Sequence, residues 1–154
     1  MAETDYDLLC RQLDALTDGV TERVSNLANA ASLLYHTLED VNWAGFYLLR
    51  EDCLALGPFM GMPACVRIPL GKGVCGTAFE RRETLVVPDV HAFPGHIACD
   101  AASRSEIVVP LRVCGAPYGV LDIDSPVPDR FSGADREGLE AFAHALERAL
   151  AQEK

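Results

Sequence analysis

Apolar residues recur at steps of three and four near both ends of the chain, which is the spacing of one helix face. A capping-box pattern at Thr4 and Asp7 precedes the first set, which comprises Leu9, Leu13 and Leu16. The second set opens after Thr21 and comprises Val24, Leu27, Ala31, Leu34 and Leu38. A second capping box at Ser132 and Asp135 precedes the third, which comprises Leu139, Phe142, Ala143, Leu146 and Leu150. We therefore predict two helices near the amino terminus and one at the carboxyl terminus.

Between these helices the pattern changes to short aromatic or apolar runs, separated by Gly, Pro, Asp and Asn. The runs are Trp43 to Leu49, Cys53 to Phe59, Leu85 to Val87, Ile107 to Val113 and Tyr118 to Ile123. Such runs predict strands, and the short turn between the first two requires an antiparallel pair. The polar stretch from Pro88 to Ser105 is too long for a simple turn, and long loops often carry function. The predicted fold is α+β, a central, mainly antiparallel sheet flanked by N- and C-terminal helices.

Composition narrows this picture. The 154 residues, 49% of them hydrophobic, fit a single domain over residues 1–154. The formal net charge of -10 and the scattered Lys and Arg residues argue against nucleic acid as a partner. The first residues are acidic where a signal peptide is basic, and no apolar run is long enough to span a membrane. We therefore expect a cytoplasmic protein that does not bind membranes.

The six cysteines do not suggest a disulfide framework, because a reducing compartment keeps them as thiols. Cys75 lies among glycines near Lys72, which is expected to favour its thiolate. Cys65 follows Pro63-Ala64 at the edge of a strand, and Cys99 lies deep in the long loop. We interpret the remaining three as bystanders: Cys10, Cys53 and Cys114. For any of the six, the alternative is a small buried hydrophobic residue.

A zinc site is one alternative use of these thiols. His96 and Cys99 could act with Cys65 or Cys75. Structural zinc sites usually contain paired knuckles such as CxxC, and this chain has none. The sequence therefore disfavours zinc.

Carboxylates give a stronger signal, because Asp122 and Asp124 are two residues apart on one face of a predicted strand. The alternative is a strand that ends at Asp122, with both acids solvated in the turn before Pro126. Glu106 opens the neighbouring apolar run and adds a third carboxyl group. Clustered carboxyls in a partly dry pocket raise one another's pKa, so this cluster could hold a cation and donate a proton.

Aromatic residues in NWAGFYLL provide candidate pocket walls: Trp43, Phe46 and Tyr47. For Trp43 and Phe46 a core position is the alternative. His91 and His96 could orient the long loop or titrate near neutral pH.

Four motifs occur in order along the chain: NWAGFYLL, GKGVCGTAF, VPDVHAFPGHIACDAASRSEIVVPL and GVLDIDS. Together they resemble the free methionine-(R)-sulfoxide reductases, which are stand-alone GAF-domain enzymes. The resemblance extends from about Asn42 to Ser125, with compatible helices at both ends. A generic GAF domain would share the fold pattern but not the three thiols Cys65, Cys75 and Cys99.

The resemblance implies a role for each matching residue. Cys99 is the expected catalytic thiol, with Cys65 as principal resolving thiol and Cys75 as an auxiliary one. The implied substrate pocket is lined by Trp43, Tyr47, Glu106, Asp122 and Asp124. A free amino acid carries an ammonium group, and we expect Glu106 and Asp122 to contact it. For the proton that the sulfoxide oxygen needs, we expect Asp124 as the donor and Glu106 as second choice.

The implied reaction is thiol-dependent reduction of free L-methionine (R)-S-oxide to methionine, by way of a cysteine sulfenic acid and an intramolecular disulfide. A thioredoxin-like reductant would reopen that disulfide. No metal or organic cofactor is expected, and the habit of GAF domains to pair through terminal helices predicts a homodimer. The alternative is a GAF-type sensor of a small ligand or of redox state, which the lack of an effector segment in this sequence disfavours.

Overall fold

The computed structural model describes residues 3–97 and 102–153. Its α-helices are α1 (Tyr6–Thr17), α2 (Arg23–Thr37), α3 (Gly73–Arg81) and α4 (Gly133–Leu150), and η1 (Val90–Ala92) is a 3-10 turn. Its strands are β1 (Trp43–Arg50), β2 (Cys53–Gly61), β3 (Arg67–Pro69), β4 (Leu85–Val87), β5 (Ser105–Val113) and β6 (Ala116–Ser125). All five predicted strands and the three predicted helices are present.

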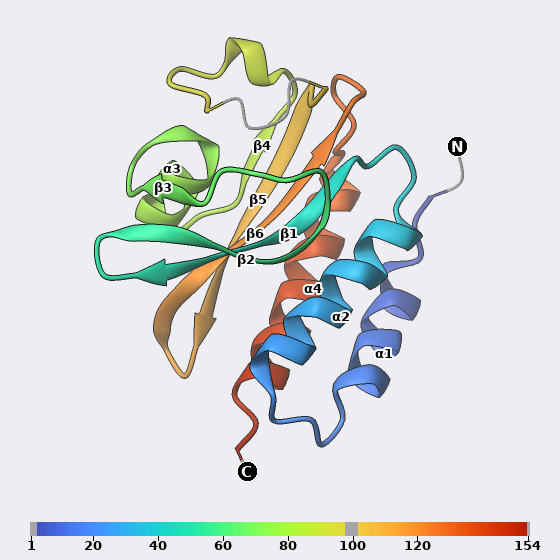
Figure 1. Ribbon diagram of the computed structural model, residues 1–154. Coiled ribbons are helices and arrows are strands. Elements are labelled where there is room, and N and C mark those ends of the chain that lie inside the picture. Colours follow the sequence, from blue (N-terminus) through green and yellow to red (C-terminus); the bar gives the residue numbers. More distant parts are fainter. Residues whose placement is uncertain (1–2, 98–101, 154) are drawn as a thin grey trace.

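The strands form one sheet in the order β3-β2-β1-β6-β5-β4, with every neighbouring pair antiparallel. The hairpins β1-β2 and β5-β6 meet where β6 pairs with β1, at the middle of the sheet. Helices α1, α2 and α4 lie on one side of this sheet, and α3 with the segment after β4 lies on the other (Figure 1). The α+β prediction is confirmed.

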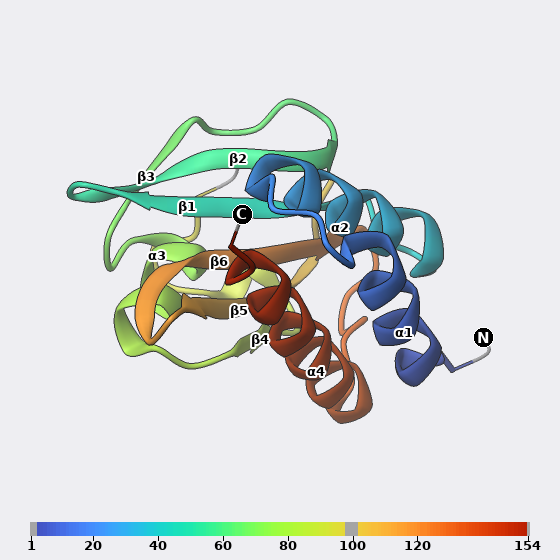
Figure 2. The same ribbon diagram turned by 90° about the horizontal axis from the view of Figure 1, so that it is seen from below.

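One face of the sheet, which we call the helix-covered face, is the main hydrophobic core. It carries alternate residues of the central strands, namely Ala44, Phe46, Leu48, Ile107, Val109, Leu111, Leu121 and Ile123. Helix α1 packs beside α2 and α4, which lie along the sheet (Figure 2). The predicted apolar face of α4 is fully buried, but Val24 of α2 is 70% exposed. That part of the α2 prediction was wrong because Val24 lies in the first turn, where the helix begins at the edge of the core.

The termini of the helices follow the capping rules closely. The capping box of Ser132 and Asp135 is present at the start of α4. At α1 the capping side chain is Asp5, which accepts a hydrogen bond from the amide of Leu8 at 3.0 Å. The sequence prediction placed this cap one residue early, at Thr4. Both residue types cap helices, so pattern alone does not separate adjacent candidates.

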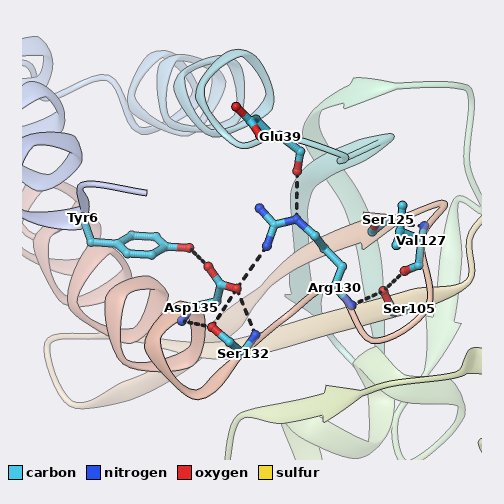
Figure 3. A network of polar contacts seen from close by, with 8 residues as sticks. All are labelled: Tyr6, Glu39, Ser105, Ser125, Val127, Arg130, Ser132 and Asp135. Atoms are coloured by element: carbon cyan, nitrogen blue, oxygen red, sulfur yellow. Dashed lines mark hydrogen bonds and ion pairs between the residues drawn. The ribbon is translucent and has the colours of Figure 1, made fainter. Parts of the chain in front are cut away.

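A polar network joins the start of α1 to the start of α4 and to the segment before α4 (Figure 3). The phenol of Tyr6 donates to one oxygen of Asp135 at 2.6 Å, and the guanidinium of Arg130 donates to the other at 3.0 Å. Arg130 also donates from Nε to the carbonyl of Glu39 at 2.9 Å. Nearby, the hydroxyl of Ser105 donates to the carbonyl of Val127 at 2.6 Å. These contacts hold the segment after β6 against the first residue of β5, immediately before Glu106.

The structure also contains elements that the sequence did not predict: β3, α3 and η1. Both β3 and η1 have three residues, too few to display a period. Helix α3 starts at Gly73 and contains Gly76, two residues that disfavour helices in isolation. No helix within residues 3–97 and 102–153 has the length and apolarity to cross a bilayer.

Candidate active site

The second face of the sheet, which we call the pocket face, bears the predicted substrate residues. Trp43 and Tyr47 of β1, Glu106 of β5, and Asp122 and Asp124 of β6 all line one cavity of about 40 Å³. Alternation along each strand brings them together, because residues two apart point to the same side. The prediction that Asp122 and Asp124 share one face is confirmed.

Strand register sets the spacing of the three acids. Asp124 lies opposite Glu106 of β5 on one side and Trp43 of β1 on the other. Asp122 lies opposite Val108 and Gly45. Strand β6 continues to Ser125, so the alternative in which it ends at Asp122 is wrong. Pairing to β1 and β5 on both sides keeps β6 extended through residues that rarely favour strands.

Glu106 and Asp122 are buried, with exposed fractions of 6% and 5%. Burial raises the pKa of Glu106 well above its ordinary value, and the charges of Asp122 and Asp124 raise it further. Burial also raises the pKa of Asp122, although hydrogen bonds to Glu106 and Asp124 partly oppose that shift. Within the described residues, Oδ1 of Asp122 is buried without a hydrogen-bond partner. The cluster therefore holds protons at a pH where exposed carboxyls are ionised, and it retains an unused acceptor.

Cys75 completes this acidic cluster from the opposite wall. It lies in the first turn of α3, is 3% exposed, and donates from Sγ to Oε2 of Glu106 at 3.9 Å. Burial, followed by the charges of Asp122 and Glu106, raises the pKa of this free thiol well above its usual range. The expectation that Lys72 favours a thiolate here was wrong. Desolvation and two buried acids outweigh one lysine at the helix start.

The aromatic wall of the cavity is built by β1 and β2. Trp43 stacks on Tyr47 and on Phe59, with ring centroids 5.9 and 5.2 Å apart. Its indole Nε1 donates to the carbonyl of Met62 at 3.1 Å, and the phenol of Tyr47 donates to the carbonyl of Cys65, also at 3.1 Å. Two pocket residues thus tether the segment that carries Cys65. Phe46 points to the helix-covered face, so the core interpretation is correct for it.

The other predicted site residues have different outcomes. Cys65 is half-buried and disulfide-bonded, and Cys99 lies outside the described residues. His96 lines the cavity, with Nε2 at 3.9 Å from Oε1 of Glu106, and burial lowers its pKa. The remaining cysteines do not line this cavity, and their bystander role stays a prediction: Cys10, Cys53 and Cys114. His91 is exposed in η1 and does not line it either.

Several lining residues were not predicted from the sequence. They are Pro63, Ala64, Ile68, Gly73, Val74, Ile97 and Ser103. Gly73 has a φ of +63°, and a Cβ there would lie 3.1 Å from Cδ1 of Ile97. Glycine therefore permits the turn into α3 and close contact with the Ile97 segment. The glycines around Cys75 indicated a close approach of the backbone, but they did not indicate which residues would lie against it.

These features define what the site can do. A cation can be held at the acids, an apolar group can pack on Trp43 and Tyr47, and a proton can be delivered by a buried carboxyl. Such a combination suits a small cationic or zwitterionic molecule with an apolar group better than it suits an anion.

The sequence of this chain is similar to those of known proteins. The family model for the GAF domain matches residues 12–150. The free methionine-R-sulfoxide reductase of Escherichia coli is 56% identical over 146 residues, which are 95% of this chain and 88% of that protein. The chain belongs to the free methionine-R-sulfoxide reductase family of GAF-domain enzymes. The resemblance seen in the sequence motifs is confirmed.

Two further members extend the comparison. The free methionine-R-sulfoxide reductase of Saccharomyces cerevisiae is 46% identical over 155 residues, covering 96% of this chain and 86% of that protein. A solved structure of fRMsr of Staphylococcus aureus, in complex with substrate, is 51% identical with a TM-score of 0.93. It covers 98% of this chain and 99% of that one. The family therefore spans nearly the whole length of this chain.

Proposed function

We propose that the protein reduces free L-methionine (R)-S-oxide to L-methionine. The observation that carries this proposal is the pocket face itself: three carboxyls from two adjacent strands, closed on one side by Trp43 and Tyr47. Membership of the reductase family supports the same activity. A peptide-bound methionine sulfoxide lacks the ammonium group that this cluster would neutralise.

Substrate recognition in this proposal uses opposite ends of the cavity. Asp122 binds the ammonium group through its unpartnered Oδ1, so Glu106 can keep its proton for the sulfoxide oxygen. A charge-assisted hydrogen bond of this kind contributes about 1.5–3 kcal/mol. The methyl group packs on Trp43 or Tyr47. Holding both ends fixes which sulfoxide epimer turns its oxygen toward the acids.

The chemical step needs a nucleophilic thiolate and a proton. In the proposal the sulfur of Cys99 attacks the sulfoxide sulfur, and a carboxyl protonates the departing oxygen. The oxygen ends on Cys99 as a sulfenic acid, and methionine leaves with its sulfur reduced by two electrons. The raised pKa of Glu106 favours it as the proton donor over the half-buried Asp124. This reverses the order that the sequence suggested.

Regeneration follows by thiol chemistry. The thiol of Cys65 attacks the sulfenic sulfur of Cys99, an S–S bond forms, and the oxygen leaves as water. A dithiol reductant of the thioredoxin class then supplies two electrons and two protons to reopen the disulfide. Two observations support Cys65 over Cys75 as the resolving thiol. Cys65 is half-buried and disulfide-bonded, whereas Cys75 is a buried free thiol whose raised pKa makes it a poor nucleophile.

A homodimer in the cytoplasm remains part of the proposal. Leu8 and Leu16 of α1 and Val24 of α2 are large apolar side chains at least 43% exposed, which supports pairing through the terminal helices. Light scattering should report twice the chain mass. A mass that stays at one chain over a wide concentration range would refute the dimer and leave the enzyme proposal intact.

The decisive assay measures free methionine, or reduced product, from four substrates under one dithiol reductant. They are the free R sulfoxide, the free S sulfoxide, the R sulfoxide with its amine acetylated, and a peptide-embedded sulfoxide. We expect turnover of the free R form alone, with kcat/KM for the acetylated form at least roughly tenfold lower, since tenfold corresponds to about 1.4 kcal/mol. Comparable turnover of the peptide or the S epimer would contradict the proposal, and binding without turnover would support a sensor.

The nucleophile is tested by Cys99→Ser. An alcohol lacks the nucleophilicity of a thiolate, so methionine formation should disappear even in a single turnover. Cys114→Ser is the matched control, because Cys114 is an exposed thiol in the turn between β5 and β6. It should leave the rate unchanged. Single-turnover activity retained in Cys99→Ser would move the nucleophile to another thiol.

A further inference from the structure

Three different donor groups lie close together in the pocket. Sγ of Cys75, a carboxylate oxygen of Glu106 and a carboxylate oxygen of Asp122 all lie within 4.8 Å of one another, and all three residues are buried. They come from separate elements, α3, β5 and β6, so the fold holds them in place. This is a different donor set from the His96 and Cys99 site that the sequence suggested and disfavoured.

We propose that this trio binds a single Zn²⁺ ion, which occupies the position of the substrate's ammonium group and blocks the pocket. Binding of the metal is independent of the enzymatic activity, whereas inhibition by the metal rests on the proposed function. The ion is thus a regulatory or toxic ligand of the reduced protein and takes no part in the reaction.

The geometry matches zinc. Bond lengths of about 2.3 Å to sulfur and about 2.0 Å to oxygen place tetrahedral ligands about 3.5 Å apart. Sγ of Cys75 and Oε2 of Glu106 are 3.9 Å apart, close to this separation. A carboxylate oxygen of Asp122 lies within 4.8 Å of the other two donors, so Asp122 would move inward to complete the bonds. Three protein ligands with the fourth position facing a cavity is also the arrangement of open zinc sites.

Donor chemistry selects against other common cations. Zn²⁺ displaces the proton of the Cys75 thiol, which then binds as a thiolate, a ligand that suits zinc or cadmium. Mg²⁺ and Ca²⁺ instead take oxygen ligands in shells of six or more and usually retain water. His96, whose Nε2 is 3.9 Å from the second oxygen of Glu106, is placed to orient that carboxylate from outside the metal's shell.

An independent observation indicates that a cation or a hydrogen-bond donor binds here. Oδ1 of Asp122 is buried in a residue that is only 5% exposed, and it has no hydrogen-bond partner within the described residues. Buried polar atoms almost always have a hydrogen-bond partner, so we expect a bound ligand to contact this oxygen. The substrate's ammonium supplies one, and Zn²⁺ supplies another that also engages the thiol of Cys75.

The test uses the full chain, reduced and transferred to metal-free buffer, and titrates Zn²⁺ against a chromogenic chelator. We expect one tight Zn²⁺ per chain, weakened by free methionine (R)-sulfoxide and unaffected by excess Mg²⁺. Cys75→Ser and Asp122→Asn should each reduce affinity at least about tenfold. Cys65→Ser and Cys114→Ser are the matched thiol controls and should bind as the parent does.

A second measurement covers the case in which a pocket variant fails to fold. X-ray absorption on the parent protein with one equivalent of Zn²⁺ should show one sulfur ligand, with oxygen or nitrogen completing the shell. Two or more sulfur ligands, unchanged affinity in both pocket variants, or loss of binding in Cys65→Ser would overturn the proposal. None of these readouts needs turnover. Zinc binding by a protein without reductase activity would leave this site standing and remove the proposed function alone.

Discussion

The two faces of the sheet differ although they are made by the same strands. Along β6, Leu121 and Ile123 enter the helix-covered face, whereas Asp122 and Asp124 enter the pocket face. The first face meets α1, α2 and α4 through apolar contacts. The second meets α3 and the segment after β4, and it contains two buried acids, a buried thiol and an unpartnered oxygen.

This difference separates stability from function. Apolar burial stabilises the fold by about 25 cal/mol per Å², whereas burial of a carboxyl costs free energy unless it is neutralised or paired. The helix-covered face contributes mainly apolar stabilisation. On the pocket face the buried acids offset part of the stabilisation from a second apolar cluster, which includes Val74, Val108 and Val120. Variants on the two faces should accordingly change different measurements.

The largest effect is expected from Glu106→Gln on the pocket face. The amide cannot donate an acidic proton, so kcat/KM should fall about 10²- to 10⁴-fold, the usual contribution of general acid catalysis. The free energy of unfolding at neutral pH should rise, because the substituted amide is always neutral, whereas the carboxyl of Glu106 is buried with a raised pKa. Steady-state kinetics and denaturant unfolding check the two parts. Asp124→Asn is the comparison for the proton donor, and a larger loss there would restore Asp124 to that role.

Phe142→Ala should have the converse signature on the helix-covered face. Phe142 is fully buried in α4, and truncating such a residue leaves a cavity that lowers the free energy of unfolding by about 3–5 kcal/mol. The rate per folded molecule should not change. Val24→Ala is the control, since this residue is 70% exposed and its truncation should stay within about 0.5 kcal/mol. A loss of activity in folded Phe142→Ala would show that the two faces are coupled.

The same contrast explains what the sequence could predict. Apolar periodicity located the helices and strands of the helix-covered face, including Leu139 and Leu146 in α4, because burial of a repeating face leaves a repeating pattern. The alternation Asp122, Asp124 also predicted a shared strand face. The family motifs then assigned roles to residues such as Trp43 and Glu106.

Contacts between segments that are distant in the chain could not be predicted from the sequence. Helix α3 covers part of the pocket, but its glycines weaken the sequence pattern that would predict a helix. Placement of Cys75 against Glu106 and Asp122 depends on three elements meeting, and the resulting desolvation overturned the expectation drawn from Lys72. The hydrogen bonds from Trp43 and Tyr47 to the segment of Cys65 likewise join residues 18 or 19 positions apart.

Opposite pH responses should distinguish the two regions. Glu106 and Asp122 have raised pKa values in the folded protein, so their stabilising contribution is complete below the unfolded pKa and is lost as pH rises through the folded pKa. For Asp135 burial raises the pKa, but hydrogen bonds from Ser132 and Tyr6 and the charge of Arg130 outweigh it and lower the pKa overall. Its contribution is present above the unfolded pKa and is lost as pH falls through the folded pKa.

Denaturant unfolding at a series of pH values from 3 to 8 measures how the free energy of unfolding depends on pH. This range extends from about one pH unit below the ordinary carboxyl pKa to about four above it. Glu106→Gln should flatten the decline in stability on the neutral side, and Asp135→Asn should flatten the loss on the acid side. Each variant should leave the opposite limb of the profile in place. Identical profiles for the two variants would contradict the assignment of opposite shifts.

The smallest effect is expected where Tyr47 of the pocket face holds the segment that carries Cys65. Tyr47→Phe removes the 3.1 Å hydrogen bond to the carbonyl of Cys65 while keeping the ring that stacks on Trp43. The free energy of unfolding should fall by only about 0.5–1.5 kcal/mol, the usual net value of one hydrogen bond. Methionine release in a single turnover should be preserved, whereas disulfide formation should slow because Cys65 is less well positioned. Quench-flow thiol counting separates the two phases.

Tyr118→Phe makes the same chemical change beside the helix-covered core and should alter neither phase. An unchanged disulfide phase in Tyr47→Phe would mean that the phenol serves only the stability of the pocket wall.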